Sequence, residues 1–215
     1  MIAKLFIAGA VALLATAGQA ATIDFEAQKI DDFGYQSYDF TENGFRVTLA
    51  PTSIFGMYLI NDPAKNLGMC GPGCASNGTT AYYGLNETSV SISHAGGDLF
   101  SLTSIDAAQT FLRLDRPLTL TLTGMQAGRN IETSIFVDPN SAARFSTFSF
   151  ANLVNLSFLT ISGGIDFPEF ALDNVVLSTS AVPEPASWAM MISGFAVVGG
   201  LMRRGRSSKA RANYV

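Results

Sequence analysis

The sequence has 215 residues, of which 14% are charged and 20 are glycine, values that suit one turn-rich domain with extra segments at its ends. Its formal net charge of −4 is unevenly distributed, because residues 22–182 hold 16 acidic and 7 basic side chains, whereas residues 203–215 hold five basic and no acidic ones. The acidic middle argues against nucleic acid as a partner, since phosphates would be repelled. It suits divalent cations or neutral glycans better.

The first 20 residues are predicted to be a secretory signal peptide. Lys4 supplies a short positive region, and residues 5–17 form an apolar stretch that is too short to span a bilayer comfortably. Gly18-Gln19-Ala20 then places small residues at a cleavage site. Cleavage is expected after Ala20, with Ala21 as the alternative position. The exported domain would then cover residues 21–181.

Within residues 21–181 the hydrophobic pattern has mostly a period of two, which predicts β-strands. Such strands are expected at residues 45–49, 90–93, 118–123, 133–137 and 156–161. Glycine-containing turns separate them, for example at 42–44, 95–97 and 127–128. Only residues 104–109 suggest a helical turn. About ten short strands with glycine turns favour an all-β fold, an antiparallel jelly-roll-like β-sandwich.

The C-terminal part contains a short motif, an apolar stretch and a basic end, in that order. The motif residues are Pro183, Glu184, Pro185, Trp188 and Ala189, and the basic end opens with Arg203, Arg204 and Arg206. A helix over residues 188–202 is about 22 Å long, short of the ~30 Å bilayer core unless flanking residues extend it. We therefore expect a single transmembrane helix at 188–202, with the basic tail at 203–215 held in the cytoplasm.

This order of elements resembles the PEP-CTERM protein-sorting signal, in its PEPxxWA variant, over residues 182–206. The resemblance implies recognition near Pro183-Glu184-Pro185 by an exosortase, a membrane-embedded, cysteine transpeptidase-like enzyme. It also implies transit through the inner membrane of a Gram-negative cell to the cell envelope, the outer surface or the extracellular space, often in biofilm-forming cells that make exopolysaccharide. An ordinary single-span membrane anchor is the alternative.

The domain itself resembles the jelly-roll domains of exported PEP-CTERM proteins and galactose-binding-like carbohydrate-binding modules. Short segments at residues 23–26, 43–45, 100–106, 122–124 and 170–175 carry this resemblance. It implies that the first strand pairs beside the last, with a structural Ca²⁺ held there by Asp24 or Glu26 and by Asp173. Asp24 and Glu26 are expected on one strand face, and carboxylate oxygens suit Ca²⁺. Charges that protect an edge strand are the alternative interpretation.

Cys70 and Cys74 are the only cysteines, and His94 is the only histidine. In an exported chain, two cysteines in a CxxxC spacing favour a local disulfide. It would shape its loop rather than add much stability, because the closed loop is short. A zinc site lacks partners, since tetrahedral zinc takes four ligands. His94 precedes Ala95-Gly96-Gly97 and is expected at a surface turn.

The sequence contains no serine-hydrolase, zinc-peptidase or P-loop motif, so no catalytic residue is assigned. Tyrosine rings near loops could stack on sugars or pack beneath the loops; they are Tyr35, Tyr38, Tyr58, Tyr82 and Tyr83. We favour a non-catalytic surface or matrix protein that binds exopolysaccharide. An exported jelly-roll glycan hydrolase is the alternative, and it would show a cleft with two facing acids, one of them with a raised pKa.

Overall fold

The computed structural model describes residues 19–28, 39–49, 57–60, 74–84, 88–110, 118–137, 144–163, 169–179 and 190–199. Two compact units are present: Gly18–Ser180 forms a β-domain, and the two chain ends form the other unit. The buried apolar clusters found in the described residues all lie in the β-domain. This unit therefore has a hydrophobic core of its own and can fold without the chain ends.

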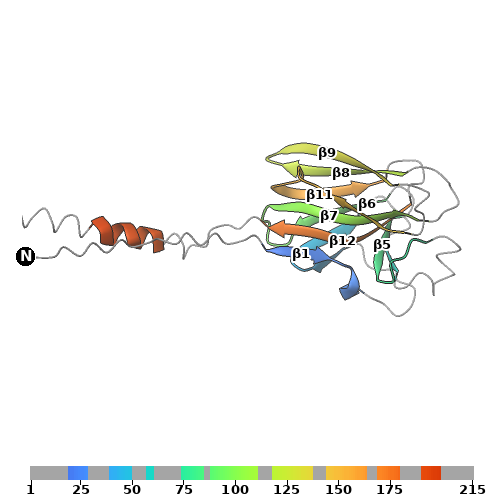
Figure 1. Cartoon of the computed structure of the whole chain (residues 1–215), viewed down its shortest axis with the longest axis horizontal. Helices are drawn as coiled ribbons and strands as arrows, with labels where there is room; N and C mark the ends of the chain where they lie inside the picture. The colour runs from blue at the N-terminus through green and yellow to red at the C-terminus, as the bar shows by residue number, and fades with distance from the viewer. Residues whose placement is uncertain are drawn as a thin grey trace, which may run out of the picture. The chain divides into compact units, whose positions relative to one another are not determined.

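The β-domain is built from antiparallel strands, shown as arrows in Figure 1. They are β1 (Ala20–Ile23), β2 (Asp39–Glu42), β3 (Phe45–Leu49), β4 (Met57–Ile60), β5 (Ala81–Gly84), β6 (Ser89–His94), β7 (Phe100–Gln109), β8 (Leu118–Gln126), β9 (Arg129–Val137), β10 (Ser146–Ser149), β11 (Leu156–Ser162) and β12 (Phe170–Thr179). One 3₁₀ helix, η1 (Glu26–Gln28), follows β1.

The strands form a sheet in the order β2-β3-β6-β11-β7-β12-β5-β4, to which β8, β9, β1 and β10 are added at its sides. β11 and β7 share only the register pair Leu156↔Phe100. We infer that the sheet curls at this weak seam into two layers. The first layer is β2-β3-β6-β11-β8-β9, and the second contains β10, β7, β12, β1, β5 and β4. The main apolar cluster takes residues from both layers and fills the space between them.

Alternation of apolar and hydroxyl side chains produces the first layer. Val90 and Ile92 of β6 are buried, while Ser91 between them faces outward and is partly exposed. β8 repeats the pattern, since its leucines are buried and its threonines are not. Because successive side chains of a strand point to opposite faces, one face enters the core and the other meets solvent. The predicted antiparallel β-sandwich is confirmed, and all five strands named from the sequence are present.

The helical turn expected at residues 104–109 is wrong, because these residues belong to β7. β7 pairs with β12 on one side and with β10 on the other. Ala107 and Ala108 are completely buried there. Alanine and glutamine favour helices in isolation, but pairing and burial on both sides of the strand outweigh that weak preference.

Residues 190–199 form a helix in the other unit, and their side chains are exposed. Within the part of the chain that the structure describes, no helix has the length and apolar character needed to cross a membrane. The helix lies inside the span 188–202, whose transmembrane role stays a prediction. Residues 1–18 of the expected signal peptide lie outside the described residues.

Candidate functional site

The first and last strands pair as expected. β1 runs antiparallel to β12, with Ala20 opposite Ser178 and Ile23 opposite Val175. The chain leaves the strand directly afterwards, since Phe25 has a positive φ of 60° and Glu26 begins η1. The expectation that Asp24 and Glu26 share a strand face is therefore wrong. Instead, the Asp24 carboxylate accepts a hydrogen bond from the backbone N–H of Glu26 at 3.1 Å and caps this turn.

Glu26 and Asp173 both bind the segment before β5. Glu26 Oε1 accepts a hydrogen bond from the Thr80 backbone N–H at 2.6 Å. Asp173 Oδ2 accepts from Asn77 Nδ2 at 2.6 Å and from Thr79 Oγ1 at 2.9 Å. Two of the three predicted calcium ligands thus reach the same four-residue segment, one from each of two elements far apart in sequence.

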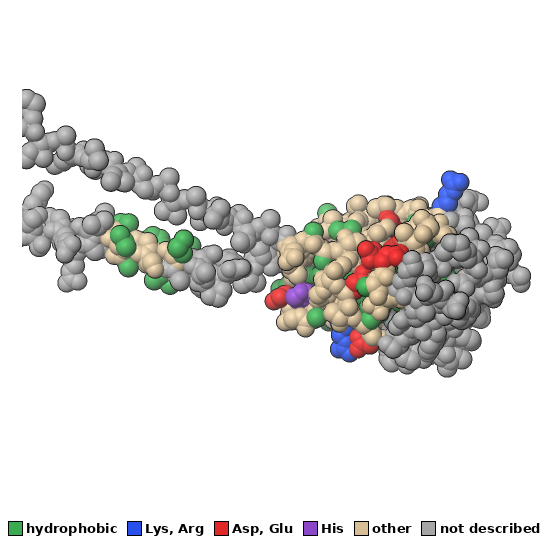
Figure 2. Space-filling view, turned by 90° about the horizontal axis from the view of Figure 1, so that it is seen from below, with side chains coloured by type: hydrophobic (Ala, Val, Ile, Leu, Met, Phe, Trp, Pro, Cys, Tyr) green, Lys and Arg blue, Asp and Glu red, His purple; other side chains and the backbone are tan. Residues whose placement is uncertain are grey.

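Asp173 is a buried carboxylate, with 1% of its surface exposed. Its burial raises the pKa, and hydrogen bonds from Asn77, Asn174 and Thr79 oppose that shift. All three of these donors are neutral groups. Figure 2 shows a patch of Asp and Glu side chains on one face of the β-domain. A cation would relieve the cost of burying this charge.

The carboxylate oxygens of Glu26 and Asp173 are suitable ligands for Ca²⁺. Among the described residues, no cluster of three or more His, Cys, Asp or Glu side chains is arranged to hold a metal ion. Two carboxylates would therefore need neutral oxygens beside them, such as Asn77 Oδ1 and Thr79 Oγ1, which Ca²⁺ accepts as ligands. The third predicted ligand, Asp24, does not join them, because its carboxylate caps η1 and interacts with Glu42.

Glu42 is a buried acid that the sequence analysis missed. It lies at the end of β2 and is 4% exposed. Its Oε1 accepts hydrogen bonds from the backbone N–H groups of Asp24 at 2.9 Å and Phe25 at 3.1 Å, whereas Oε2 has no hydrogen-bond partner among the described residues. Burial, together with the nearby Asp24 carboxylate, raises the pKa of Glu42 to about 7. Alternation along β2 was the available signal, because it places Glu42 on the inward face beside Phe40.

Two of the tyrosines predicted to stack on sugars are completely buried. Tyr82 packs its ring against Phe25 and Phe170, and the Tyr83 hydroxyl donates a hydrogen bond to the Ala75 carbonyl. Burial raises the pKa of both hydroxyls. Neither ring presents a face to a ligand, so the binding role predicted for them is wrong. Tyr35 and Tyr38 lie outside the described residues, as does the side chain of Tyr58.

Cys74 is disulfide-bonded and packs against the smaller buried cluster that contains Tyr83. Its expected partner, Cys70, lies outside the described residues, so the pairing stays a prediction. His94 ends β6 and is less exposed than a surface turn implies, since its side chain is 18% exposed. The ring meets Phe45 edge to face, with 5.2 Å between the centroids.

The outward face of the first layer is lined by serine and threonine. In one row the register places Thr48 beside Ser91, Ser91 beside Thr160, and Thr160 beside Thr123. A second row contains Ser89, Ser162, Thr121 and Ser134. We call these eight residues the hydroxyl face.

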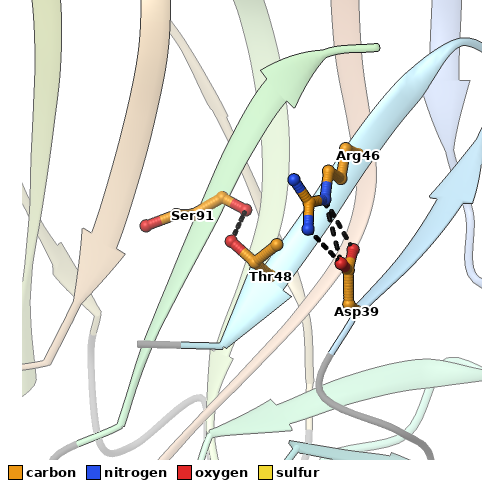
Figure 3. A network of polar contacts seen from close by, with 4 residues as sticks. All are labelled: Asp39, Arg46, Thr48 and Ser91. Carbon is orange, nitrogen blue, oxygen red and sulfur yellow. Dashed lines mark hydrogen bonds and ion pairs between the residues drawn. The ribbon is translucent and has the colours of Figure 1, made fainter. Parts of the chain in front are cut away.

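Hydrogen bonds and one ion pair organise the hydroxyl face. Ser91 Oγ and Thr160 Oγ1 are 3.0 Å apart. Thr48 Oγ1 donates to the Ser91 carbonyl at 3.5 Å, as Figure 3 shows. At the β2 margin, Arg46 Nε lies 2.9 Å from the Asp39 carboxylate, which holds the pKa of Asp39 below its ordinary value. Charges thus stand at the margin of this face, while its centre is neutral.

Comparison with known proteins identifies the C-terminal segment. Residues 181–207 match the family model of the PEP-CTERM protein-sorting motif. The chain carries a PEP-CTERM sorting motif. No curated protein matches the chain. The sorting motif predicted at residues 182–206 is confirmed, and it marks the chain as one exported to the cell envelope or surface.

Solved structures similar to the chain are distant ones. The K1 cleaved adhesin domain of Lys-gingipain from Porphyromonas gingivalis W83 is 13% identical, with a TM-score of 0.48, over 76% of this chain and 100% of that one. The CBM22-1 xylan-binding domain of Xyn10C from Paenibacillus barcinonensis is 12% identical, with a TM-score of 0.43, over 78% and 99%. TmCBM61, solved with β-1,4-galactotriose, is 9% identical, with a TM-score of 0.40, over 73% and 94%.

Replacing Glu42 with Gln should remove a pH dependence of stability. Because the folded-state pKa of Glu42 is raised to about 7, the wild-type domain should lose up to about 3 kcal/mol of this group's contribution as the pH rises from about 4.5 through 7. Glu42→Gln keeps a neutral side chain throughout. Urea unfolding of residues 21–182 between pH 4.5 and 8 should show that the free energy of unfolding of the variant increases relative to that of wild type as the pH rises. Exposed Glu132→Gln is the control, and parallel curves for wild type and Glu42→Gln would contradict the assignment.

Proposed function

We propose that this is an exported, non-catalytic surface or matrix protein that binds exopolysaccharide. A signal peptide at 1–20 directs export, exosortase recognises the sorting signal at 182–206, and the tail helix holds the chain in the inner membrane until processing. The β-domain, residues 21–181, then binds a neutral glycan through its hydroxyl face. The match of residues 181–207 to the sorting motif supports delivery, and the hydroxyl face supports the ligand class.

The chemistry of the hydroxyl face is the observation that carries the glycan proposal. Each serine or threonine hydroxyl donates one hydrogen bond and accepts two, as a sugar hydroxyl does. Neighbouring strands lie about 4.8 Å apart, so a sugar chain lying across Thr48, Ser91, Thr160 and Thr123 would meet a hydroxyl at every strand. The neutral centre of the face costs little to desolvate compared with a charged surface. A neutral polysaccharide therefore suits it better than an acidic one.

The buried acids support a non-catalytic role. Glu42 and Asp24 are two facing carboxyls, and one of them has a raised pKa, as a hydrolase would require. However, Glu42 is 4% exposed, and its Oε1 is occupied by two backbone N–H groups. A general acid must come within hydrogen-bond reach of the glycosidic oxygen. Because Glu42 is buried, a sugar could not come within that reach in this structure, so we assign this pair to the packing of the core.

Removing hydroxyls from the centre of the hydroxyl face should weaken glycan binding. Glycan-array screening of residues 21–182 with neutral oligosaccharides identifies the best ligand, and titration then compares variants. The double variant Thr123→Val and Thr160→Val should bind that ligand at least about tenfold more weakly, because it loses several hydrogen bonds of roughly 1 kcal/mol each. Thr103→Val, at an exposed position of β7 in the second layer, is the matched control. Equal affinity of the double variant and wild type would overturn the proposed surface.

Calcium should stabilise the β-domain if Glu26 and Asp173 hold it. A ligand that binds only the folded state at 100 times its dissociation constant adds about 2.7 kcal/mol to the free energy of unfolding. The melting temperature of residues 21–182 should therefore rise with millimolar Ca²⁺, and Asp173→Asn should abolish the rise. Glu132→Gln should respond as wild type does. An unchanged melting temperature in Ca²⁺ would end the metal proposal and leave the glycan proposal intact.

Substitutions in the sorting motif should block processing without unfolding the domain. Glu184→Ala in the full chain, expressed in a Gram-negative cell that has an exosortase, should keep the mass of the tail-containing form. Ser187→Ala is the matched control, because it changes a variable position of the PEPxxWA pattern and should be processed normally. Mass spectrometry of the membrane and surface fractions makes the comparison. A Glu184→Ala protein with the mature wild-type mass counts against exosortase recognition.

A further inference from the structure

Strand β9 lies at the free margin of the first layer. Among the described residues it pairs with β8 alone, and Figure 1 shows it as the outermost strand of that layer. It has 9 residues, whereas the other described strands with a single neighbour, β1, β2, β4 and β10, have 4 each. One backbone edge of β9 therefore offers N–H and C=O groups to a further strand along its whole length.

β9 lacks the features that usually protect such an edge. Proteins protect their edge strands by short length, β-bulges, prolines or lysines. β9 contains no proline and no lysine, and its register with β8 runs without a shift from end to end. By contrast, the short margin strand β2 carries an ion pair between Asp39 and Arg46 of β3. The edge of β9 is thus better suited to strand pairing than to solvent.

Apolar side chains on both faces of β9 are incompletely covered. Phe136, on the outward face, is 59% exposed, more than any other large apolar side chain described in the β-domain. Ile131 and Ile135, on the inward face, pack against the main apolar cluster but are only partly buried. Aromatic side chains are enriched in the interfaces between proteins. A further strand paired with β9 would cover part of all three side chains.

β9 is complementary to a second copy of itself. Two antiparallel copies centred on Thr133 pair over the full length of the strand. Ile131 then stands opposite the partner's Ile135, and Glu132 stands opposite the partner's Ser134, so that no like charges face each other. Centring the strands on Glu132 would instead set two carboxylates opposite each other, which is destabilising. Centring them on Ser134 shortens the overlap, and intermediate registers place inward-facing residues beside outward-facing ones.

We propose that the β-domain forms a two-fold dimer in which β9 pairs antiparallel with the β9 strand of a second copy, centred on Thr133. The first layers of the two copies then join into one continuous sheet. Because each contact of a two-fold interface occurs twice, Glu132 faces the partner's Ser134, and Ser134 faces the partner's Glu132.

The dimer also joins the hydroxyl faces of the two copies. Within one copy Thr123 lies beside Glu132, and Thr121 lies beside Ser134. The row that contains Thr123 therefore continues, through Glu132 and the partner's Ser134, into the row that contains the partner's Thr121. Dimer formation does not depend on glycan binding, but it would lengthen the surface that the proposed function offers to a polysaccharide.

Charge substitutions at the exposed Ser134 test this register. Ser134→Lys should form an ion pair with the partner's Glu132 on each side of the two-fold axis and lower the dimer dissociation constant about fivefold, whereas Ser134→Glu should raise it about fivefold. Sedimentation equilibrium of residues 21–182 over a concentration series, without sugar, measures this constant. Thr103→Lys and Thr103→Glu, at an exposed position of β7, make the same changes in net charge and should dimerise as wild type does.

Two double variants complete the test. Adding Glu132→Lys to Ser134→Glu exchanges the charges and should reverse the loss of affinity. The hydroxyl-face variant Thr123→Val and Thr160→Val should dimerise as wild type does, which separates failure of the dimer from failure of the neutral-glycan surface. The proposal is overturned if the wild-type domain stays monomeric up to about millimolar concentration. It is also overturned if Ser134→Lys and Ser134→Glu change the dissociation constant in the same direction.

Discussion

The antiparallel pairing of β1 with β12 joins the two ends of the β-domain, and the other features of interest depend on it. It brings Ile23 opposite Val175, so that the turn after β1 and the acid of β12 approach the same segment. Glu26 and Asp173 consequently bind adjacent residues, Thr80 and Thr79. The same pairing sets Gln19 against Thr179, and both residues line a polar pocket of about 560 Å³. Without it, neither group of residues would be assembled.

This arrangement requires a strained backbone at Phe25, whose φ of 60° is uncommon for a residue other than glycine. Such backbone strain costs about 1–3 kcal/mol and persists only where the surroundings enforce it. The Phe25 ring is 1% exposed and contacts Phe40 and Tyr82, which anchors the side chain. Glu42 Oε1 accepts from the consecutive N–H groups of Asp24 and Phe25 at the start of this turn. A buried carboxyl is thus retained where the strained backbone needs an acceptor.

The sequence alone predicted which side chains are buried wherever the alternation within a single strand determines it. The alternating leucine and threonine of β8 predict both its buried face and its hydroxyl face. β5 shows the limit, because all four of its residues are buried. Tyr82 packs into the main apolar cluster and Ala81 and Tyr83 into the smaller one, so both faces of β5 are covered and alternation gives no signal. Tyr82 and Tyr83 were misread for this reason. The register that aligns Thr48, Ser91, Thr160 and Thr123 into a row joins four strands, and a pattern within one strand cannot reveal it.

The topology also gives the β-domain two different ends. Tight turns, such as Asn43-Gly44 and Ala127-Gly128, lie at the end where β1 begins and β12 finishes. β3, β7, β9 and β11 all run toward the opposite end, where longer connections join them to the next strand. Thr179, the last residue of β12, therefore lies at the end of the β-domain that carries the tight turns. The hydroxyl face crosses the strands between these ends, so a polysaccharide bound there would lie across β3, β6, β11 and β8.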